Sequence, residues 1–254
     1  MTTKPLIVDI ITVEPSMWSA LDSGVIGRAK RESLWQLHTW QLRDFAEKKD
    51  GRIDDKPYGG NPGMVISYPP LDRAIKSIHK HRDHKPYVIL PDPAGTPVTQ
   101  SMLADLAEHK HLAFVCGRYE GIDERFCTQH VDLRASLGPY VVSAGDLPAM
   151  VMVDGIVRLL PGALGNRLSA QRDSFHDWLV DHPCYTRPQT YNGDLVPEVL
   201  TQGNHQKILA WERMHQLGRT LETHPERFIG QSLKIDDIAQ LRQYFQKSPP
   251  PESE

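Results

Sequence analysis

The chain has 254 residues, of which 39% are hydrophobic and 24% are charged, so it can bury one large core or two modest ones and is not disordered throughout. Its formal net charge is −3, so binding of a polyanion would depend on local basic patches rather than on overall charge. No apolar run approaches the roughly 20 residues that a membrane helix requires, and the first residues lack the pattern of a signal peptide.

Strands and helices alternate in the first half of the chain. The apolar run from Leu6 to Val13 predicts a buried strand, and a helix is predicted from Glu14 to Leu21. Two short apolar runs predict further strands over Tyr87 to Leu90, ended by Pro91, and over Leu112 to Cys116. Thr99 is predicted to cap a helix between them. This alternation predicts an α/β domain with a largely parallel sheet.

The second half of the chain reads as mainly helical. A helix is predicted from about Leu147 to Leu160, and because it is apolar on most sides it must be buried in a core or against another subunit. A polar segment without periodicity follows and predicts a linker. Apolar residues at helical spacing then recur near 208–217 and 235–241. The predicted division is an α/β domain over 1–164, a linker over 165–173 and a small helical domain over 174–254.

The common nucleotide-binding motifs are absent from the sequence. Neither GxGxxG nor GxxxxGK[ST] occurs, which disfavours dehydrogenases, P-loop NTPases and the common methyltransferase fold. The chain has three cysteines and no CxxC spacing, which indicates a reducing compartment. Together with the missing membrane helix and signal peptide, this predicts a cytoplasmic protein.

Two other segments suggest chemistry but favour simpler interpretations. The histidines between His79 and His84 could bind a metal, yet their charged neighbours favour a solvated loop, and no metal site is predicted there. Cys184, beside His182, is more readily a packing residue than a nucleophile because no cysteine–histidine protease signature surrounds it.

Three glycine-rich segments stand out: Tyr58 to Met64, Cys116 to Arg125, and Gly138 to Gly145. Glycine lets a ligand approach the main chain closely, and the last two segments follow or adjoin apolar strands. Loops at the carboxyl ends of parallel strands form the ligand crevice of such sheets. Each segment alone could be a tight turn without a ligand, but three in one domain favour a binding site.

These segments resemble the bacterial tRNA (guanine-37-N1)-methyltransferases, the TrmD family of the knotted SPOUT superfamily. The run CGRYEGIDER from Cys116 to Arg125 and the downstream Tyr185 to Pro188 are highly specific to it. The similarity covers nearly the whole chain in the family's order. The other matching stretches are Pro57 to Gly60, Pro62 to Met64, Leu147 to Met150, Leu160 to Gly162, Asp173 to Phe175, His182 to Pro183, Val196 to Pro197, Leu200, Gly203 to His205 and Leu217 to Thr220.

This resemblance implies a SPOUT-type α/β fold with a deep trefoil knot, a rare exception to the rule that chains do not thread loops. It also implies that the knot loops bind S-adenosylmethionine in a bent shape, mainly through backbone groups, and that the protein is a homodimer with each active site at the subunit interface. The implied donor-binding residues are Leu90, Pro91, Gly95, Gly117, Tyr119, Glu120, Gly121, Leu137, Gly138, Tyr140, Val142, Ala144 and Gly145.

Methylation of guanine N1 needs a base for its proton and a cation near O6, where negative charge develops. The family pattern implies Asp173 as the base and Arg158 as the cation, and a supporting role for Tyr119 and Glu120. Without the resemblance, Asp173 would be interpreted as a helix N-cap ahead of residues 175–179. Arg158 would be interpreted as a snorkelling or interface side chain.

The implied substrate is tRNA with guanosine at position 37, whose methylation helps to maintain the reading frame. A splayed loop base would be read by base-edge contacts. Basic side chains such as Lys30 and Arg31 are expected to bind phosphates, although each alone is more often a solvated surface charge. The predicted tRNA-binding residues are Arg28, Arg167, Ser169, Asn204, His205, Lys207 and Arg213.

The sequence departs from the family pattern at several positions. Arg172 replaces the acidic neighbour of the catalytic aspartate, a residue linked to magnesium dependence, so a requirement for Mg²⁺ stays open. Ala144 and Asp146 stand where the family has glycine and glutamate. Pro91 lies in the loop from Leu90 to Gly95, which the resemblance assigns to S-adenosylmethionine. Two alternatives remain, namely a related knotted methyltransferase with another RNA target and a non-catalytic RNA-binding protein.

Overall fold

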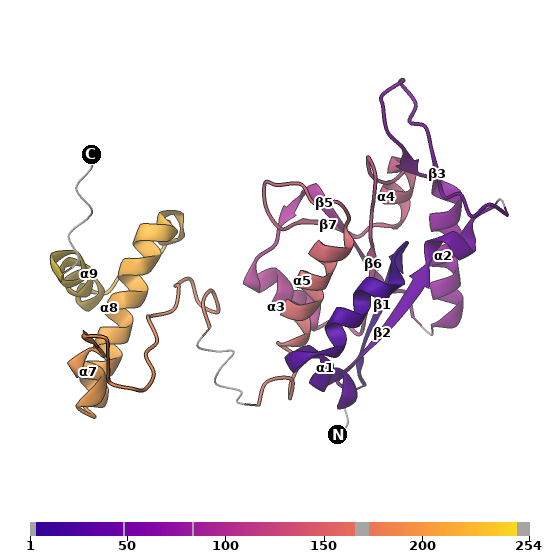
Figure 1. The fold of residues 1–254 in the computed structure, drawn as a ribbon. Helices are drawn as coiled ribbons and strands as arrows, with labels where there is room; N and C mark the ends of the chain where they lie inside the picture. Colours follow the sequence, from indigo (N-terminus) through magenta and orange to yellow (C-terminus); the bar gives the residue numbers. More distant parts are fainter. Residues whose placement is uncertain (1–3, 48, 83, 166–172, 248–254) are drawn as a thin grey trace. The chain divides into compact units, whose positions relative to one another are not determined.

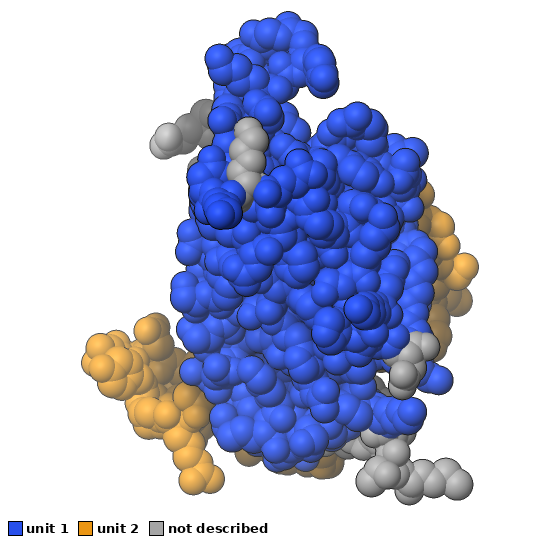
Figure 2. Space-filling view, turned by 90° about the vertical axis from the view of Figure 1, so that its right-hand side faces the viewer, with its two compact units in different colours: residues 1–167 blue, residues 168–254 orange. Residues whose placement is uncertain are grey.

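The computed structural model describes residues 4–47, 49–82, 84–165 and 173–247 (Figure 1). It divides into two compact units, residues 1–167 and 168–254, which Figure 2 colours separately. The predicted domain boundaries stay predictions, since all of the linker except its two end residues lies outside the described residues. Among the helices in the described ranges, none is both long and apolar enough to cross a membrane.

The first unit is built on a five-stranded sheet. Its strands are β1 (Leu6–Thr12), β2 (Trp35–Gln41), β5 (Tyr87–Pro97), β6 (His111–Val115) and β7 (Leu133–Ser136). Their spatial order is β2-β1-β6-β5-β7, and every neighbouring pair is parallel. The predicted α/β fold with a parallel sheet is therefore confirmed, whereas the trefoil knot stays a prediction.

Helices cover both faces of this sheet (Figure 1). One face carries the 3-10 helix η1 (Pro15–Asp22), α1 (Gly24–Arg31), α3 (Gln100–Ala107) and α5 (Asp146–Val157), and the other carries α2 (Tyr68–His81) and α4 (Glu124–His130). Along β1, Ile10 faces the first core and Ile11 the second, and in β6 Phe114 and Val115 alternate in the same way. Strands buried on both faces appear in sequence as continuous apolar runs, which explains why β1 and β6 were predicted correctly.

The local predictions around these elements have mixed outcomes. Thr99 caps α3 as predicted, because its hydroxyl accepts the Met102 N–H at 3.2 Å. The helix predicted from Glu14 is present as the 3-10 helix η1 rather than an α-helix. The predicted loop between His79 and His84 is wrong at its start, because residues 79–81 form the last turn of α2.

Strand β5 does not end at Pro91, as predicted, but continues to Pro97. Pro91 and Thr96 both pair with Ala135 of β7, so the residues between them form a bulge. Proline is tolerated here because β6 pairs with β5 only over residues 87–89, and no second neighbour needs the missing N–H. Gly95 packs directly on β7, where a Cβ atom would lie 2.5 Å from the Ala135 nitrogen.

A buried carboxylate in β1 organises one region of this unit. Asp9 is fully buried and accepts hydrogen bonds from Trp40 Nε1 at 2.8 Å and Arg82 at 2.9 Å, and its other oxygen lies 2.6 Å from His111 Nε2. Burial alone would raise the pKa of Asp9, but the bonds from His111, Arg82 and Trp40 outweigh it and lower the pKa to about 2. Arg82, which directly follows α2, is therefore an internal counter-ion.

Short elements complete the first unit. The 3-10 helix η2 (Leu42–Phe45) follows β2, and the strands β3 (Asp54–Asp55) and β4 (Val65–Ile66) form an antiparallel pair. Tyr58, in the loop between these strands, is 98% exposed.

The second unit contains the two predicted helices, α8 (His205–Thr223) and α9 (Ile235–Lys247). It also contains α7 (Glu198–Thr201) and the 3-10 helix η3 (Pro225–Phe228), which were not predicted. A two-stranded hairpin, β8 (Thr190–Tyr191) with β9 (Asp194–Leu195), was not predicted. Its turn is Asn192–Gly193 with both residues at positive φ, the usual pattern for a two-residue hairpin.

Gly218 permits α8 and α9 to pack closely, and we expect Gly218→Ala to destabilise the second unit by about 1–3 kcal/mol through overpacking. A Cβ atom at this position would lie 2.3 Å from ring atoms of the buried Tyr244 of α9. Urea unfolding of the full chain, followed by circular dichroism, measures the effect. Gln206→Ala, at an exposed position of the same helix, is the matched control, and equal stability of both variants would contradict the prediction.

Candidate active site

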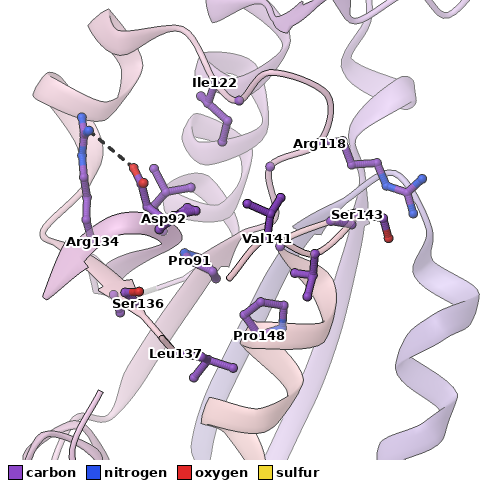
Figure 3. Close-up of a pocket in the computed structure, with 18 of the residues that line it drawn as sticks. Pro91, Asp92, Arg118, Ile122, Arg134, Ser136, Leu137, Val141, Ser143 and Pro148 are labelled. Carbon is purple, nitrogen blue, oxygen red and sulfur yellow. Dashed lines mark ion pairs between the residues drawn. The ribbon is translucent and has the colours of Figure 1, made fainter. Parts of the chain in front are cut away.

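A cavity of about 390 Å³ lies at the carboxyl ends of β5, β6 and β7, where a parallel sheet is expected to bind its ligand. Figure 3 shows its walls, with Pro91 from β5, Arg118 and Ile122 after β6, and Ser136 and Leu137 at the end of β7. The segment from residue 140 to Gly145 and Pro148 of α5 complete the lining. The glycine-rich segments that follow β6 and β7 therefore converge on one cavity.

Every residue predicted to bind the donor lines this cavity except Gly95, which packs against β7. Several other residues that line the cavity were not predicted individually. Most of them lie next to predicted residues in the same loops. These additional residues are Asp92, Pro93, Arg118, Ile122, Glu124, Cys127, Arg134, Ala135, Ser136, Val141, Ser143 and Pro148.

The loops after β6 and before α5 are joined through their backbones. Gly145 N–H donates to the Gly117 carbonyl at 2.8 Å, and Arg118 and Ala144 form an isolated antiparallel bridge. A Cβ atom on Gly145 would lie 3.0 Å from the Gly117 nitrogen, so the absence of a side chain lets the two segments approach closely. Tyr119 has φ +58°, a conformation that costs energy for a residue other than glycine and is concentrated at functional sites.

The charged side chains in the lining are three carboxylates (Asp92, Glu120 and Glu124) and two guanidinium groups (Arg118 and Arg134), a balance of 2 − 3 = −1. Arg134 bridges two of the walls, pairing with Asp92 at 3.5 Å and with Glu124 at 2.5 Å (Figure 3 marks the first pair). Asp92 also accepts the Ala94 N–H at 2.8 Å, which fixes the β5 bulge. This lining suits a ligand that carries a positive charge.

A fully buried aspartate, Asp146, directly follows the segment from residue 140 to Gly145 that lines the cavity. One carboxylate oxygen of Asp146, the first residue of α5, accepts the Thr12 hydroxyl at 2.5 Å and the Trp18 indole N–H at 3.0 Å. Burial raises the pKa of the neighbouring Cys116 thiol well above its usual value, and the Asp146 carboxylate adds to the rise. No local sequence signal identified this anchor, because its partners lie 134 and 128 residues away.

The loop between β3 and β4 reaches the same region. Glu120 N–H donates to the Met64 carbonyl at 2.9 Å, and Ile66 N–H donates to the Gly121 carbonyl at 3.0 Å. At Gly63 a Cβ atom would lie 2.5 Å from Glu120 Cγ. The glycine-rich segment that begins at Tyr58 is therefore held against the rim of the cavity.

The two predicted catalytic residues belong to different units. Arg158 directly follows α5 in the first unit, is half-buried, and donates its N–H to the Asp154 carbonyl at 3.1 Å. Asp173, in the second unit, lines a cavity of about 340 Å³ together with Asp177 and His182. Residues 175–179 form turns rather than a helix, so the interpretation of Asp173 as a helix N-cap is wrong.

The predicted tRNA-binding residues lie on different elements and have different contacts. Arg28 donates to the Ala163 carbonyl at 2.6 Å, and Arg213 pairs with Asp237 at 2.9 Å, so both have structural contacts. Asn204 caps α8 by accepting the Lys207 N–H at 3.2 Å. His205 and Lys207 are exposed in the first turn of that helix, and Arg167 and Ser169 lie outside the described residues.

Other candidate groups have plainer structural roles. Cys184 is exposed, so its prediction as a packing residue is wrong, whereas Cys116 and Cys127 are buried. Within the residues that the structure describes, no three His, Cys, Asp or Glu side chains converge as metal ligands would.

Comparisons with known proteins agree with this geometry. The family model described as tRNA (Guanine-1)-methyltransferase TrmD matches residues 6–229. The tRNA (guanine-N(1)-)-methyltransferase of Hydrogenovibrio crunogenus is 47% identical over 221 residues, covering 87% of this chain and 93% of that protein. The protein of the same name from Stutzerimonas stutzeri is 42% identical over 241 residues, covering 94% of this chain and 96% of that protein.

A solved structure is also similar. The tRNA (m1G37) methyltransferase from Aquifex aeolicus superposes with a TM-score of 0.72 at 33% identity, covering 87% of this chain and 94% of that chain. The similarity in sequence and in fold thus extends along almost the whole chain. The chain belongs to the TrmD family and is an enzyme of the tRNA (guanine-N1)-methyltransferase class.

Proposed function

We propose that this enzyme transfers the methyl group of S-adenosylmethionine to N1 of guanosine 37 in tRNA, next to the anticodon, and so helps to maintain the reading frame. The observation that carries the proposal is the cavity at the carboxyl ends of β5, β6 and β7, lined by the loops that the family resemblance assigns to the donor. Membership of the family and the name of the Aquifex aeolicus relative support the reaction and the position.

The cavity fits this donor in size and in charge. Its volume of about 390 Å³ lies within the range of about 300–1,000 Å³ that is typical of small-molecule sites. Gly117 and Gly145 line the cavity without side chains, so a ligand can approach the main chain closely. The carboxylates of Asp92, Glu120 and Glu124 outnumber the two guanidinium groups of the lining. When bound, S-adenosylmethionine supplies an electrophilic methyl group on a positively charged sulfur.

The chain's own residues must then activate the guanine. N1 carries a proton at neutral pH, and its removal moves negative charge towards O6. We assign the base to Asp173 and the stabilisation of O6 to Arg158, whose guanidinium stays charged and offers several donors. Tyr119 and Glu120 have a supporting role in recognising the guanine at the rim of the cavity, where Tyr119 is half exposed.

We further propose that the enzyme is a homodimer. Apolar side chains are exposed on the cavity-lining segment before α5 and on α5 itself. Val141 is 87% exposed, and Leu147 and Val151 are 46% and 57% exposed. The prediction that a helix apolar on most sides must be covered therefore points to a second subunit. Sedimentation should give about twice the chain mass of 28.8 kDa, and a monomer at micromolar concentration would contradict this.

The proposed reaction is tested by incubating the purified chain with labelled S-adenosylmethionine and two unmodified tRNA transcripts that differ only in having G37 or A37. We expect label to enter the G37 transcript and not the A37 transcript. Equal labelling of both would indicate a related methyltransferase with another target. Tight tRNA binding without transfer would indicate a non-catalytic RNA-binding protein.

Gly145→Ala should weaken binding of S-adenosylmethionine about tenfold, because inserting a methyl group into a closely packed site typically costs about 1–3 kcal/mol. The added methyl group would lie 3.0 Å from the Gly117 nitrogen and 3.2 Å from Cys116 Cα, so the segments at Gly117 and Gly145 would have to shift by a few tenths of an ångström. Isothermal titration calorimetry measures the effect. Gly165→Ala is the control, because a Cβ atom there meets nothing within 4 Å, and equal affinities for both variants would refute the role of the contact.

A further inference from the structure

We propose that Asp146 is a specificity-determining residue whose buried negative charge makes the donor cavity prefer S-adenosylmethionine, which carries a positive charge on sulfur, over the by-product S-adenosylhomocysteine, in which the sulfur is neutral. This inference rests on the proposed function, since it assumes that the donor binds in the cavity at the ends of β5, β6 and β7.

Asp146 lies directly behind the wall of that cavity. Its neighbours Ala144, Gly145 and Pro148 all line the cavity, whereas Asp146 itself is fully buried. The Cα atoms of adjacent residues are only about 3.8 Å apart, so the backbone of Asp146 directly adjoins the lining. From the adjoining loop, Gly117 lines the cavity, and the thiol of its neighbour Cys116 is close enough to Asp146 for the carboxylate to raise the thiol pKa.

The groups that donate hydrogen bonds to Asp146 carry no charge of their own. Both groups that donate to it, the Thr12 hydroxyl and the Trp18 indole N–H, are neutral, and both bond to the same oxygen. Its second oxygen is buried and has no hydrogen-bond partner among the described residues. By contrast, Arg134 pairs with Asp92 and Glu124 of the lining, whereas Glu120 and Glu124 are exposed, so water screens them.

The methyl-transfer reaction removes the positive charge that Asp146 attracts. Transfer leaves the electron pair of the S–CH₃ bond on sulfur, which becomes an uncharged thioether, while N1 gains the methyl group and its proton goes to the base. The attraction to Asp146 is therefore present for the donor and absent for the by-product. A unit charge about 10 Å away, in surroundings with an effective dielectric constant of about 20, changes a binding constant on the order of tenfold.

The test measures the dissociation constants of both ligands by calorimetry on the full chain. We expect Asp146→Asn, which keeps an oxygen acceptor for Thr12 and Trp18, to reduce the preference for S-adenosylmethionine about tenfold. Asp146→Glu keeps the charge and should keep the preference. Thr12→Val removes one anchoring bond but no charge, so it should weaken both ligands by the same factor.

A preference in Asp146→Asn within twofold of the wild type would overturn the proposal, because a merely structural anchor changes both affinities together. If Asp146→Asn does not fold, Asp146→Ser provides the same uncharged comparison with a smaller side chain. A wild-type chain that binds neither ligand would overturn the proposed function instead, which separates the two failures.

Discussion

Replacing Asp173 by asparagine should lower kcat for methyl transfer by about 10²–10⁴-fold, the usual contribution of a general base. The amide has nearly the size of the carboxylate but cannot accept the proton of guanine N1. The KM for the methyl donor should stay within about twofold, because the residue acts on the guanine. Steady-state kinetics with a G37 transcript measures both values.

Asp177→Asn is the matched control for this experiment. Asp177 lines the same cavity of the second unit as Asp173, and it is exposed. Its removal changes the local charge by the same amount but should leave kcat within about twofold, as expected for a surface substitution. If kcat falls equally in both variants, the reaction depends on the negative charge of this cavity and not on a general base at Asp173.

Replacing Arg82 by methionine should destabilise the first unit by about 3–5 kcal/mol, because it leaves a buried carboxylate without its main counter-ion. Arg82 donates to both oxygens of the fully buried Asp9, at 3.1 and 2.9 Å. Methionine keeps most of the side-chain length and removes the charge. Urea unfolding at pH 7, followed by tryptophan fluorescence, measures the change.

The same pair predicts how stability depends on pH. The pKa of Asp9 is about 2 in the folded chain, below its usual value of 3.8. A lowered folded-state pKa stabilises the fold above the unfolded-state pKa, and this contribution, about 2 kcal/mol, is lost as the pH falls from about 4 to 2. In Arg82→Met this pH dependence should be smaller.

Lys76→Met is the control, because it also removes one positive charge, from α2, but the pair that it breaks is exposed. Lys76 pairs with Asp72 at 2.7 Å on the surface of α2, and its side chain is 67% exposed. Exposed pairs contribute less than about 1 kcal/mol, so this variant should unfold close to the wild type. Similar stability of Arg82→Met and the wild type would contradict the importance of the buried pair.

Sequence patterns predicted the parts of the fold that rest on local signals. The apolar runs of β1 and β6 and the cap at Thr99 were predicted correctly, because burial on both faces and capping act over a few residues. The strand β2 was missed, since Gln36, His38 and Gln41 interrupt its apolar pattern. The continuation of β5 past Pro91 depends on its pairing with β7, which no local pattern shows.

The candidate site divides in the same way. Glycine-rich segments after strands predicted the walls of the donor cavity, because glycines at strand ends and the geometry of parallel sheets are visible in sequence. The anchor at Asp146 was missed, since Thr12 and Trp18 are distant in the chain and meet it only in the folded unit. Arg28 and Arg213, predicted to bind phosphates, have internal partners that sequence alone does not show.

The most direct test of the proposed reaction is to identify the methylated nucleoside and its position. A G37 transcript incubated with the wild-type enzyme and S-adenosylmethionine would be digested to fragments and to nucleosides, and both would be analysed by mass spectrometry. We predict a single modified nucleoside, N1-methylguanosine, confined to the fragment that contains position 37. A different methylated nucleoside, or N1-methylguanosine at another position, would contradict the proposed function.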